Sequence, residues 1–195
     1  MSTRTPRQTP RSKSKEQSWL NSRVLWIVGA ILGVIILAPI VMGLLDGGDG
    51  TPEALAGVVE EFPDDGQDHV EEGTDVDYET DPPTSGPHYP RWAPPDIYRQ
   101  VVEDELLVHN LEHGHIVIYY SPEQLSDEAV TKITELTNEY DGDWDAVLAV
   151  PRPDMENELT LTAWTYMMEL DEYDEELIDE FVDAYRGKGP ENPVR

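Results

Sequence analysis

Hydrophobic and polar positions divide the chain into one long apolar run and a series of short periodic segments. The run, residues 24–45, reads VLWIVGAILGVIILAPIVMGLL and contains no charged side chain. A helix of roughly 20 apolar residues spans the core of a bilayer, where each backbone polar group must be paired internally. The run therefore predicts a transmembrane helix. A cleaved signal peptide with its cleavage site at residues 54–56 (ALA) is the alternative, but the apolar region of such a peptide is typically shorter.

The shorter patterns that follow the run predict a mixture of helices and strands. The β-branched and aromatic residues IVIYY are typical of a buried strand. Ser126 and Asp174 each precede a helical stripe of apolar residues and are favourable N-cap residues, and Gly187 follows the second stripe. The predicted elements are strands at 116–120, 146–150 and 159–164 and helices at 126–140 and 174–186, while 97–108 fits either type. The turn PRPDMENE joins the second and third strands.

These elements predict an α+β fold, a small and mainly antiparallel sheet packed with helices, preceded by one N-terminal transmembrane helix. Composition sets the expected boundaries. They are a basic cytoplasmic tail at 1–23, the transmembrane helix at 24–45, an acidic tether at 46–78 and an extracytoplasmic α+β domain at 79–195. Six prolines between residues 82 and 95 fix φ and predict a stiff loop at the start of this domain.

The distribution of charge predicts the orientation in the membrane. The chain has 13 Lys and Arg and 41 Asp and Glu, and six of the basic residues precede the apolar run. Basic residues beside a membrane helix stay in the cytoplasm, so we expect a single-pass protein of the cell membrane with its N-terminus inside and its C-terminal domain outside. The expected partners are the membrane, through one integral span, and another protein of the cell envelope.

The net charge of -28 disfavours nucleic acid as a ligand, because an acidic surface repels phosphate groups. Such a surface is also typical of proteins that work at high salt concentration. The chain has no cysteine, which excludes disulfides, thiolate metal ligands and cysteine nucleophiles.

Histidine is the residue type that most clearly indicates a site. His109, His113 and His115 lie within VHNLEHGHIVI, together with Glu112, and His88 lies in the proline-rich loop. The spacing of His109 and His113 places both rings on one face of a helix. Imidazole and carboxylate are the usual transition-metal ligands where cysteine is missing, so these five residues predict a copper or zinc site. Met167 and Met168 are candidate thioether ligands that would favour copper.

Two alternatives to metal handling remain open from these residues. In the first, the histidines are hydrogen-bonded parts of a scaffold, and the domain is a structural or protein-interaction module of the cell envelope without a metal. In the second, His109, Glu112 and His113 match H-x-x-E-H, in which two histidines hold zinc and the glutamate is the general base of a hydrolase. That chemistry needs a third ligand from a later helix, for which Glu135 and Glu139 are the candidates. Binding is favoured over catalysis, and no catalytic residue is assigned.

Four separated blocks resemble a known family, the domain-of-unknown-function family 3105. The blocks are PPTSGPHYPRWA, LVHNLEHGHIVIYY, LTAW and YRGKGPE, in this order between residues 82 and 191. The resemblance implies an extracytoplasmic domain anchored by one N-terminal span, and it implies no established activity. His88, His109, Glu112 and His113 match its motifs, whereas His115 stands where many relatives have a small or aromatic residue. The resulting hypothesis is a membrane-tethered extracytoplasmic domain with a histidine-based metal site.

Overall fold

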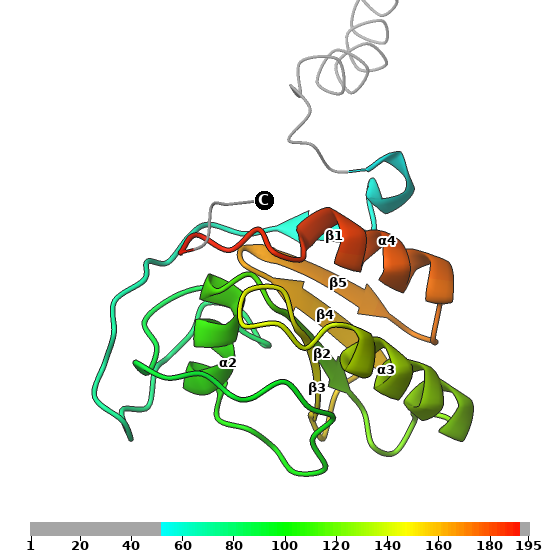
Figure 1. Cartoon of the computed structure of the whole chain (residues 1–195), viewed down its shortest axis with the longest axis horizontal. Coiled ribbons are helices and arrows are strands. Elements are labelled where there is room, and N and C mark those ends of the chain that lie inside the picture. The colour runs from blue at the N-terminus through cyan, green and yellow to red at the C-terminus, as the bar shows by residue number, and fades with distance from the viewer. Residues whose placement is uncertain (1–51, 192–195) are drawn as a thin grey trace, which may run out of the picture. The chain divides into compact units, whose positions relative to one another are not determined.

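A five-stranded sheet with helices on both faces forms the centre of residues 52–191, which are the part of the chain that the computed structural model describes (Figure 1). The strands are, in chain order, β1 (Val59–Glu61), β2 (Ile116–Tyr120), β3 (Val147–Pro151), β4 (Leu159–Ala163) and β5 (Tyr166–Leu170). The α-helices are α2 (Asp104–Glu112), α3 (Asp127–Glu139) and α4 (Glu175–Tyr185), and a short 3₁₀ helix, η1, covers Glu53–Leu55. The predicted α+β class is confirmed.

The strand order is β1-β5-β4-β2-β3, and every neighbouring pair is antiparallel except β2 and β3. Strands β3 and β4 follow each other in the chain but do not pair, because β2 lies between them and bonds to both. The turn PRPDMENE therefore does not close a hairpin. Helix α3 lies in the connection between β2 and β3, as a parallel pair requires. Strand β5 was not predicted from the sequence.

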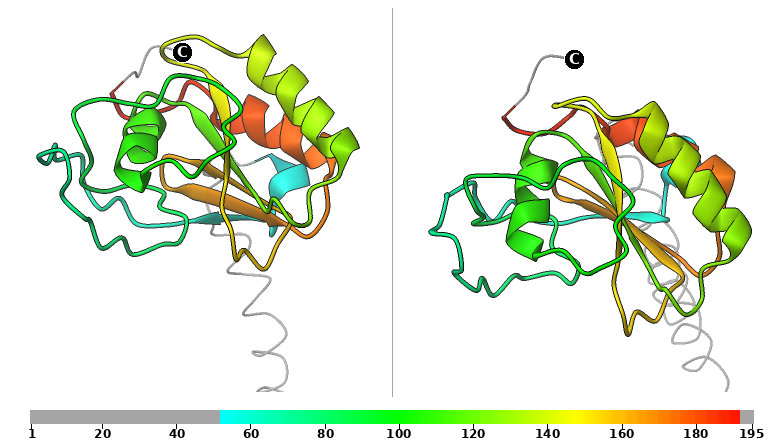
Figure 2. Two further views of the ribbon diagram at one scale, coloured as in Figure 1. Left: turned by 90° about the horizontal axis from the view of Figure 1, so that it is seen from below. Right: turned by 60° about the horizontal axis from the view of Figure 1, so that its bottom comes forward.

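Both faces of the sheet are buried, and they carry different helices (Figure 2). Ile116 and Ile118 of β2 pack in the cluster that includes side chains of α3 and α4. Val117 and Tyr119, which alternate with them, pack with Leu107 and other residues of α2 on the opposite face. The core thus separates α2, which carries histidines, from the two acidic helices.

Local sequence rules explain where the helices begin. The Ser126 hydroxyl accepts a hydrogen bond from the amide of Ala129 at 3.1 Å, and the Asp174 carboxylate accepts one from the amide of Leu177 at 3.1 Å. Both predicted N-caps are confirmed. The ambiguous segment 97–108 resolves into an irregular stretch followed by α2, which begins at Asp104.

The folded unit begins earlier than the predicted boundary at residue 79. One compact unit spans Thr51–Arg195, β1 pairs with β5, and Leu55 is fully buried in the core. The stretch 52–78, predicted as a tether, is therefore part of the domain. The predicted membrane helix at 24–45 and the basic tail lie outside the described residues. Within residues 52–191, none of the helices combines the length and apolarity needed to cross a bilayer.

Candidate metal centre

All five histidines of the chain gather at the C-terminal end of α2. Neighbouring rings lie close together, with centroids 5.0 Å apart for His69 and His88, 5.0 Å for His88 and His109, 4.7 Å for His109 and His113, and 5.8 Å for His113 and His115. The side chains come from three segments: the stretch before the proline-rich loop, that loop itself, and α2 with the residues after it. Except for His69, each histidine is at most 4% exposed.

Helix α2 and the turn that ends it position three members of the group. His109 and Glu112 are helical, and His113 is the C-cap with α-helical φ and ψ, so the two histidines share a face as predicted. Gly114 follows at φ +88°, a conformation that only glycine adopts without strain, and turns the chain into β2. His88 joins them from the loop, where its backbone pairs with the segment of His69 in an isolated bridge.

Three of the rings are oriented in the same way, with Nδ1 against a backbone carbonyl. The Nδ1–oxygen distances are 2.8 Å for His88 and Gly86, 2.6 Å for His109 and Tyr89, and 3.1 Å for His113 and Asp143. A carbonyl oxygen only accepts hydrogen bonds, so each Nδ1 carries a proton and donates it. If such a ring is neutral, its Nε2 carries no proton and has a free lone pair. This is the form of histidine that binds metals.

The Nε2 atoms meet one another and two carboxylates. The distances are 3.1 Å between Nε2 of His109 and of His113, 3.0 Å from Nε2 of His88 to Oε2 of Glu112, 3.8 Å from Nε2 of His69 to the same oxygen, and 2.9 Å from Nε2 of His113 to Oε2 of Glu191. For His88, His109 and His113, whose Nδ1 atoms donate to carbonyls, neutral rings and ionised carboxylates leave both atoms of each contact as acceptors. A cation between the two atoms, either a proton or a metal ion, would reconcile them. A proton bridges the two acceptors of one contact, whereas a metal ion binds three or four acceptor atoms at once.

These distances are compatible with a metal coordination shell. Nitrogen and oxygen ligands lie about 2.0–2.1 Å from zinc, so two ligands of a tetrahedral ion are roughly 3.4 Å apart. Two groups of ligand atoms that all lie within 4.8 Å of one another are formed by the described residues. The first contains His69, His88, His109 and Glu112, and the second contains His109, His113 and Glu191.

Burial keeps His109 in its ligand form. It lowers the pKa of His109 to about 4; the hydrogen bond to Tyr89 opposes this shift, and the neighbouring histidines add to it. The ring is therefore neutral at neutral pH, and its Nε2 is available. The carbonyl partners also hold the rings in place, as outer partners of metal-binding histidines generally do.

Glu191 reaches His113 because two glycines bring the C-terminal segment against the end of α2. The amide of Gly187 donates to the carbonyl of Gly114 at 2.7 Å, and the amide of Glu191 donates to the carbonyl of Glu112 at 3.2 Å. A Cβ at Gly114 would lie 2.8 Å from the amide nitrogen of Gly189. The two backbone segments are therefore too close for a side chain at Gly114. The block YRGKGPE thus completes the site that begins in VHNLEHG.

His115 has a different environment from the other predicted ligands. Its Nε2 donates to the carbonyl of Asp143 at 2.8 Å, and its Nδ1 accepts from the side-chain amide of Asn110 at 2.8 Å. Asn110 also pairs with both backbone groups of Ala93, which fastens the proline-rich loop to α2. Both ring nitrogens of His115 are therefore occupied, and it belongs to neither ligand group.

Three tryptophans surround the histidines. Trp144 stacks on His113 with centroids 4.2 Å apart, and Trp92 lies 4.4 Å from the same ring on a tilted plane. Both are partly exposed, at 41% and 38%, so they cover His113 and separate it from bulk water. Trp164 meets the edge of His88 at 6.5 Å.

Most of the other predicted side chains lie away from this centre. Met168 of β5 is fully buried in the cluster with α3 and α4, across the sheet from α2. Met167 of β5 pairs with Thr162 of β4, which pairs with Val117, so it lies on the sheet face that α2 covers. Glu135 and Glu139 are exposed on α3 and belong to neither ligand group, so the third ligand that a hydrolase of the H-x-x-E-H type requires does not come from that helix. The two groups that could hold a metal instead include His69 and Glu191, neither of which was predicted.

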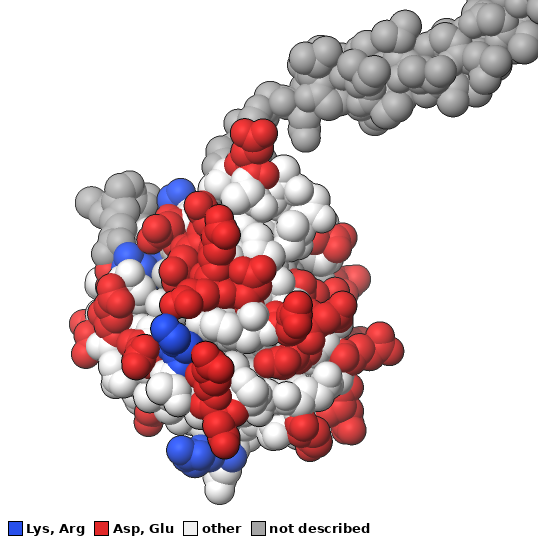
Figure 3. All heavy atoms as spheres, turned by 90° about the vertical axis from the view of Figure 1, so that its right-hand side faces the viewer, with Lys and Arg blue, Asp and Glu red and all other residues white. Residues whose placement is uncertain are grey.

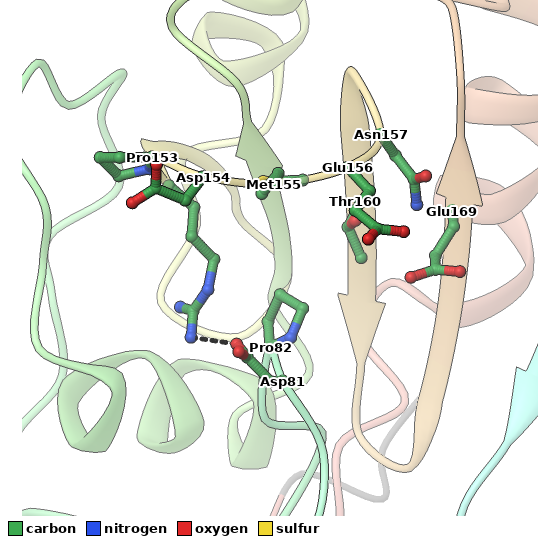
Figure 4. A pocket seen from close by; sticks show the side chains of 10 residues that line it. Asp81, Pro82, Pro153, Asp154, Met155, Glu156, Asn157, Thr160 and Glu169 are labelled. Carbon is green, nitrogen blue, oxygen red and sulfur yellow. Dashed lines mark hydrogen bonds and ion pairs between the residues drawn. The ribbon is translucent and has the colours of Figure 1, made fainter.

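Two other surface features are distinct from this centre. A polar pocket of about 290 Å³ lies between the β3–β4 turn and Asp81 (Figure 4), but its only basic residue, Arg152, is already paired with Asp81 and with Asp104 at 2.8 Å. The face formed by α3 and α4 is covered with carboxylates (Figure 3). There, burial and the neighbouring Glu175 and Asp183 raise the pKa of Asp179, which shows how closely the acids are spaced.

Comparison with known proteins places these residues in one family. The family described as "Protein of unknown function (DUF3105)" matches residues 69–195, a span that begins at His69 and includes all five histidines and Glu191. No curated protein and no solved structure matches the chain. Because the match covers more than half of the sequence, the chain belongs to the DUF3105 family.

Proposed function

We propose that this domain binds one transition-metal ion, copper or zinc, through histidine Nε2 atoms at the end of α2. The observation that carries the proposal is the convergence of acceptors: Nε2 of His109 lies 3.1 Å from Nε2 of His113, and each ring has its Nδ1 bound to a carbonyl. A scaffold built from hydrogen bonds would pair each acceptor with a donor, as His115 does.

The ligand types narrow the choice of metal. Imidazole and carboxylate suit zinc and copper, and copper binds such sites more tightly in the usual order of affinities. The buried position of Met168 on the other face of the sheet removes one of the thioethers that would select copper. We therefore propose a site that accepts either ion, with copper retained more strongly when both are present.

The test is the metal content of the full-length chain, purified in detergent through a tag that contains no histidine or cysteine. After loading with copper or zinc and desalting, we expect about one ion per chain by mass spectrometry. The variant His109→Gln should lose the ion, because His109 belongs to both groups of ligand atoms. Retention of a full equivalent by this variant would contradict the proposal.

Glu112→Gln and Glu105→Gln form a matched pair for the carboxylate. Both glutamates lie on α2 and are nearly buried, at 5% and 7% exposed. Glu105 accepts from the amide of Val76 at 3.1 Å and is in neither ligand group, so its replacement should leave the metal content unchanged. Equal loss in both variants would indicate general damage to α2 rather than removal of a ligand.

We further propose that the domain is tethered outside the cell membrane by a helix at 24–45 and hands its metal to another envelope protein. The apolar run and the basic residues before it support this topology. The chain has no cysteine, so Thr5→Cys and Glu176→Cys provide single labelling positions. A maleimide that cannot cross membranes should label only the second variant in intact cells; labelling of the first alone would reverse the topology.

A further inference from the structure

The two ligand groups overlap in one residue, His109. The first group joins it to His69, His88 and Glu112, and the second joins it to His113 and Glu191. Nδ1 of His109 donates to the carbonyl of Tyr89 at 2.6 Å, so the ring offers only Nε2. One nitrogen lone pair binds one ion at a time, and the two groups therefore cannot both hold an ion that uses His109.

Each group also has its own contact with solvent. The side chain of His69 is 49% exposed at one end of the row, and that of Glu191 is 48% exposed at the other. The residues between them are buried, and Trp92 and Trp144 lie against His113 from the solvent side. An ion can exchange with solvent or a partner at either end, while the middle of the row is closed.

The geometry allows an ion to move along the row without becoming free. His88 and Glu112 contact each other at 3.0 Å, and His109 contacts His113 at 3.1 Å, so an ion bound in the first group is within a few ångströms of the second. It can exchange one ligand at a time while Nε2 of His109 stays bound. The second group supplies three protein ligands, which leaves a tetrahedral ion one position for a ligand from an acceptor.

We propose that a single ion occupies two overlapping positions that share His109, and that His109 hands it from the His69 end to the Glu191 end. This inference rests on the proposed metal binding. On this inference, the ion enters at His69 and leaves at Glu191. At the Glu191 end, a partner protein that presents a histidine, carboxylate or thioether supplies the fourth ligand of the ion.

The test uses Co(II), whose visible absorption depends on its ligand set, bound to the full-length chain in detergent. His69→Ala, which leaves three ligands in the first group, should shift the ion towards the Glu191 position, and Glu191→Ala, which leaves two in the second group, should confine it to the His69 position. Both replaced side chains are about half exposed, so folding should be unaffected. Glu176→Ala, which removes one exposed carboxylate from α4, is the charge-matched control.

We expect one Co(II) per chain throughout, different spectra for His69→Ala and Glu191→Ala, and a wild-type spectrum that lies between the two. The control should match the wild type. Two ions per wild-type chain would overturn the shared ligand, and a wild-type spectrum identical to that of one variant would overturn the second position. Absence of bound Co(II), copper and zinc from the wild type would instead contradict metal binding itself, so the two failures are distinguishable.

Discussion

Nε2 of His109 and Nε2 of His113 lie 3.1 Å apart, and two neutral rings whose Nδ1 atoms donate to carbonyls have no proton to place between them. Lone pairs at this distance repel each other unless a cation bridges them. The contact is built into the end of α2, because residues four apart in a helix share a face. On the proposed function, formation of the helix brings the two ligand atoms together.

Replacement of His109 by glutamine should stabilise the metal-free protein at acid pH relative to the wild type. Burial lowers the pKa of His109 to about 4, below the 6.5 of an exposed histidine, so the unfolded chain binds this proton more readily. Wild-type stability is then complete above about pH 6.5 and falls as the pH drops towards 4, by up to ~3 kcal/mol from this group. His109→Gln lacks this loss.

The measurement is chemical unfolding of the wild type and His109→Gln between pH 4 and 7, with chelator present. The difference in unfolding free energy between the two proteins should change in favour of the variant as the pH falls. Both proteins have the same surface carboxylates, so the contribution of these groups to the pH dependence cancels in the difference. A difference that stays constant across this range would show that His109 titrates normally.

Gly114→Ala should destabilise the fold more than Gly73→Ala, although both glycines have nearly the same positive φ. Their φ values are +88° and +87°, so the conformational cost of a side chain, about 1–2 kcal/mol, is common to both. A Cβ at Gly73 meets nothing within 4 Å, whereas one at Gly114 meets the backbone of Gly187 and Gly189. We expect an additional loss of about 1–3 kcal/mol for Gly114→Ala.

Thermal or denaturant unfolding of the two alanine variants measures this difference. Gly114→Ala should also weaken metal retention, because it displaces the segment that carries Glu191, while Gly73→Ala should not. Equal destabilisation of the two variants would mean that the contact between the C-terminal segment and the end of α2 contributes little.

Copper should quench tryptophan fluorescence more than zinc does. Trp92 and Trp144 lie 4.4 Å and 4.2 Å from His113, and Trp164 lies 6.5 Å from His88. Cu(II) has unfilled d levels that accept excitation energy and electrons at such distances, and Zn(II) has not. Titration of the full chain should therefore give a decrease that saturates near one equivalent, and the decrease should be smaller in a Trp144→Phe variant.

Zinc provides the control for that titration, because it occupies the same ligands without the electronic quenching. A chelator should restore the fluorescence of the copper-bound chain. If copper and zinc changed the emission equally, the effect would come from a conformational change rather than from a nearby Cu(II) ion.

Salt should stabilise the domain against unfolding. Acidic residues outnumber basic ones by 41 to 13, and α4 alone presents Glu175, Glu176, Asp179, Glu180 and Asp183 on its surface. Raising the ionic strength from 0.1 to 1 M shortens the screening length from about 10 Å to about 3 Å, which weakens repulsion among these carboxylates. We expect the unfolding midpoint in urea to rise with NaCl.

The combined variant Glu176→Gln/Glu180→Gln tests the origin of that effect, since it removes two charges from the acidic face without changing side-chain size. It should be more stable than the wild type at low salt and should respond less to added salt. A midpoint independent of salt in the wild type would show that the acidic surface imposes no cost on folding.

Local sequence patterns were sufficient for several features of the structure. Strand β2, the caps Ser126 and Asp174, and the shared face of His109 and His113 all follow from interactions between residues close in the chain, for which periodicity and capping chemistry are reliable guides. The crowding of histidines with a glutamate in the sequence identified His88, His109, His113 and Glu112 as candidate ligands. The structure places three of them in one ligand group and His109 and His113 in the other.

Tertiary structure alone decided the rest. No local pattern shows that β2 separates β3 from β4, that His69 pairs with the backbone of His88, or that Gly187 bonds to Gly114 and so places Glu191 beside His113. Tertiary contacts also give His113 and His115 different roles. A carbonyl and a side-chain amide occupy both ring nitrogens of His115. In His113 a carbonyl occupies only Nδ1, and Nε2 lies among acceptors. The physical reason is distance along the chain: these contacts join segments far apart in sequence, and they depend on how the sheet packs rather than on any periodicity within a segment.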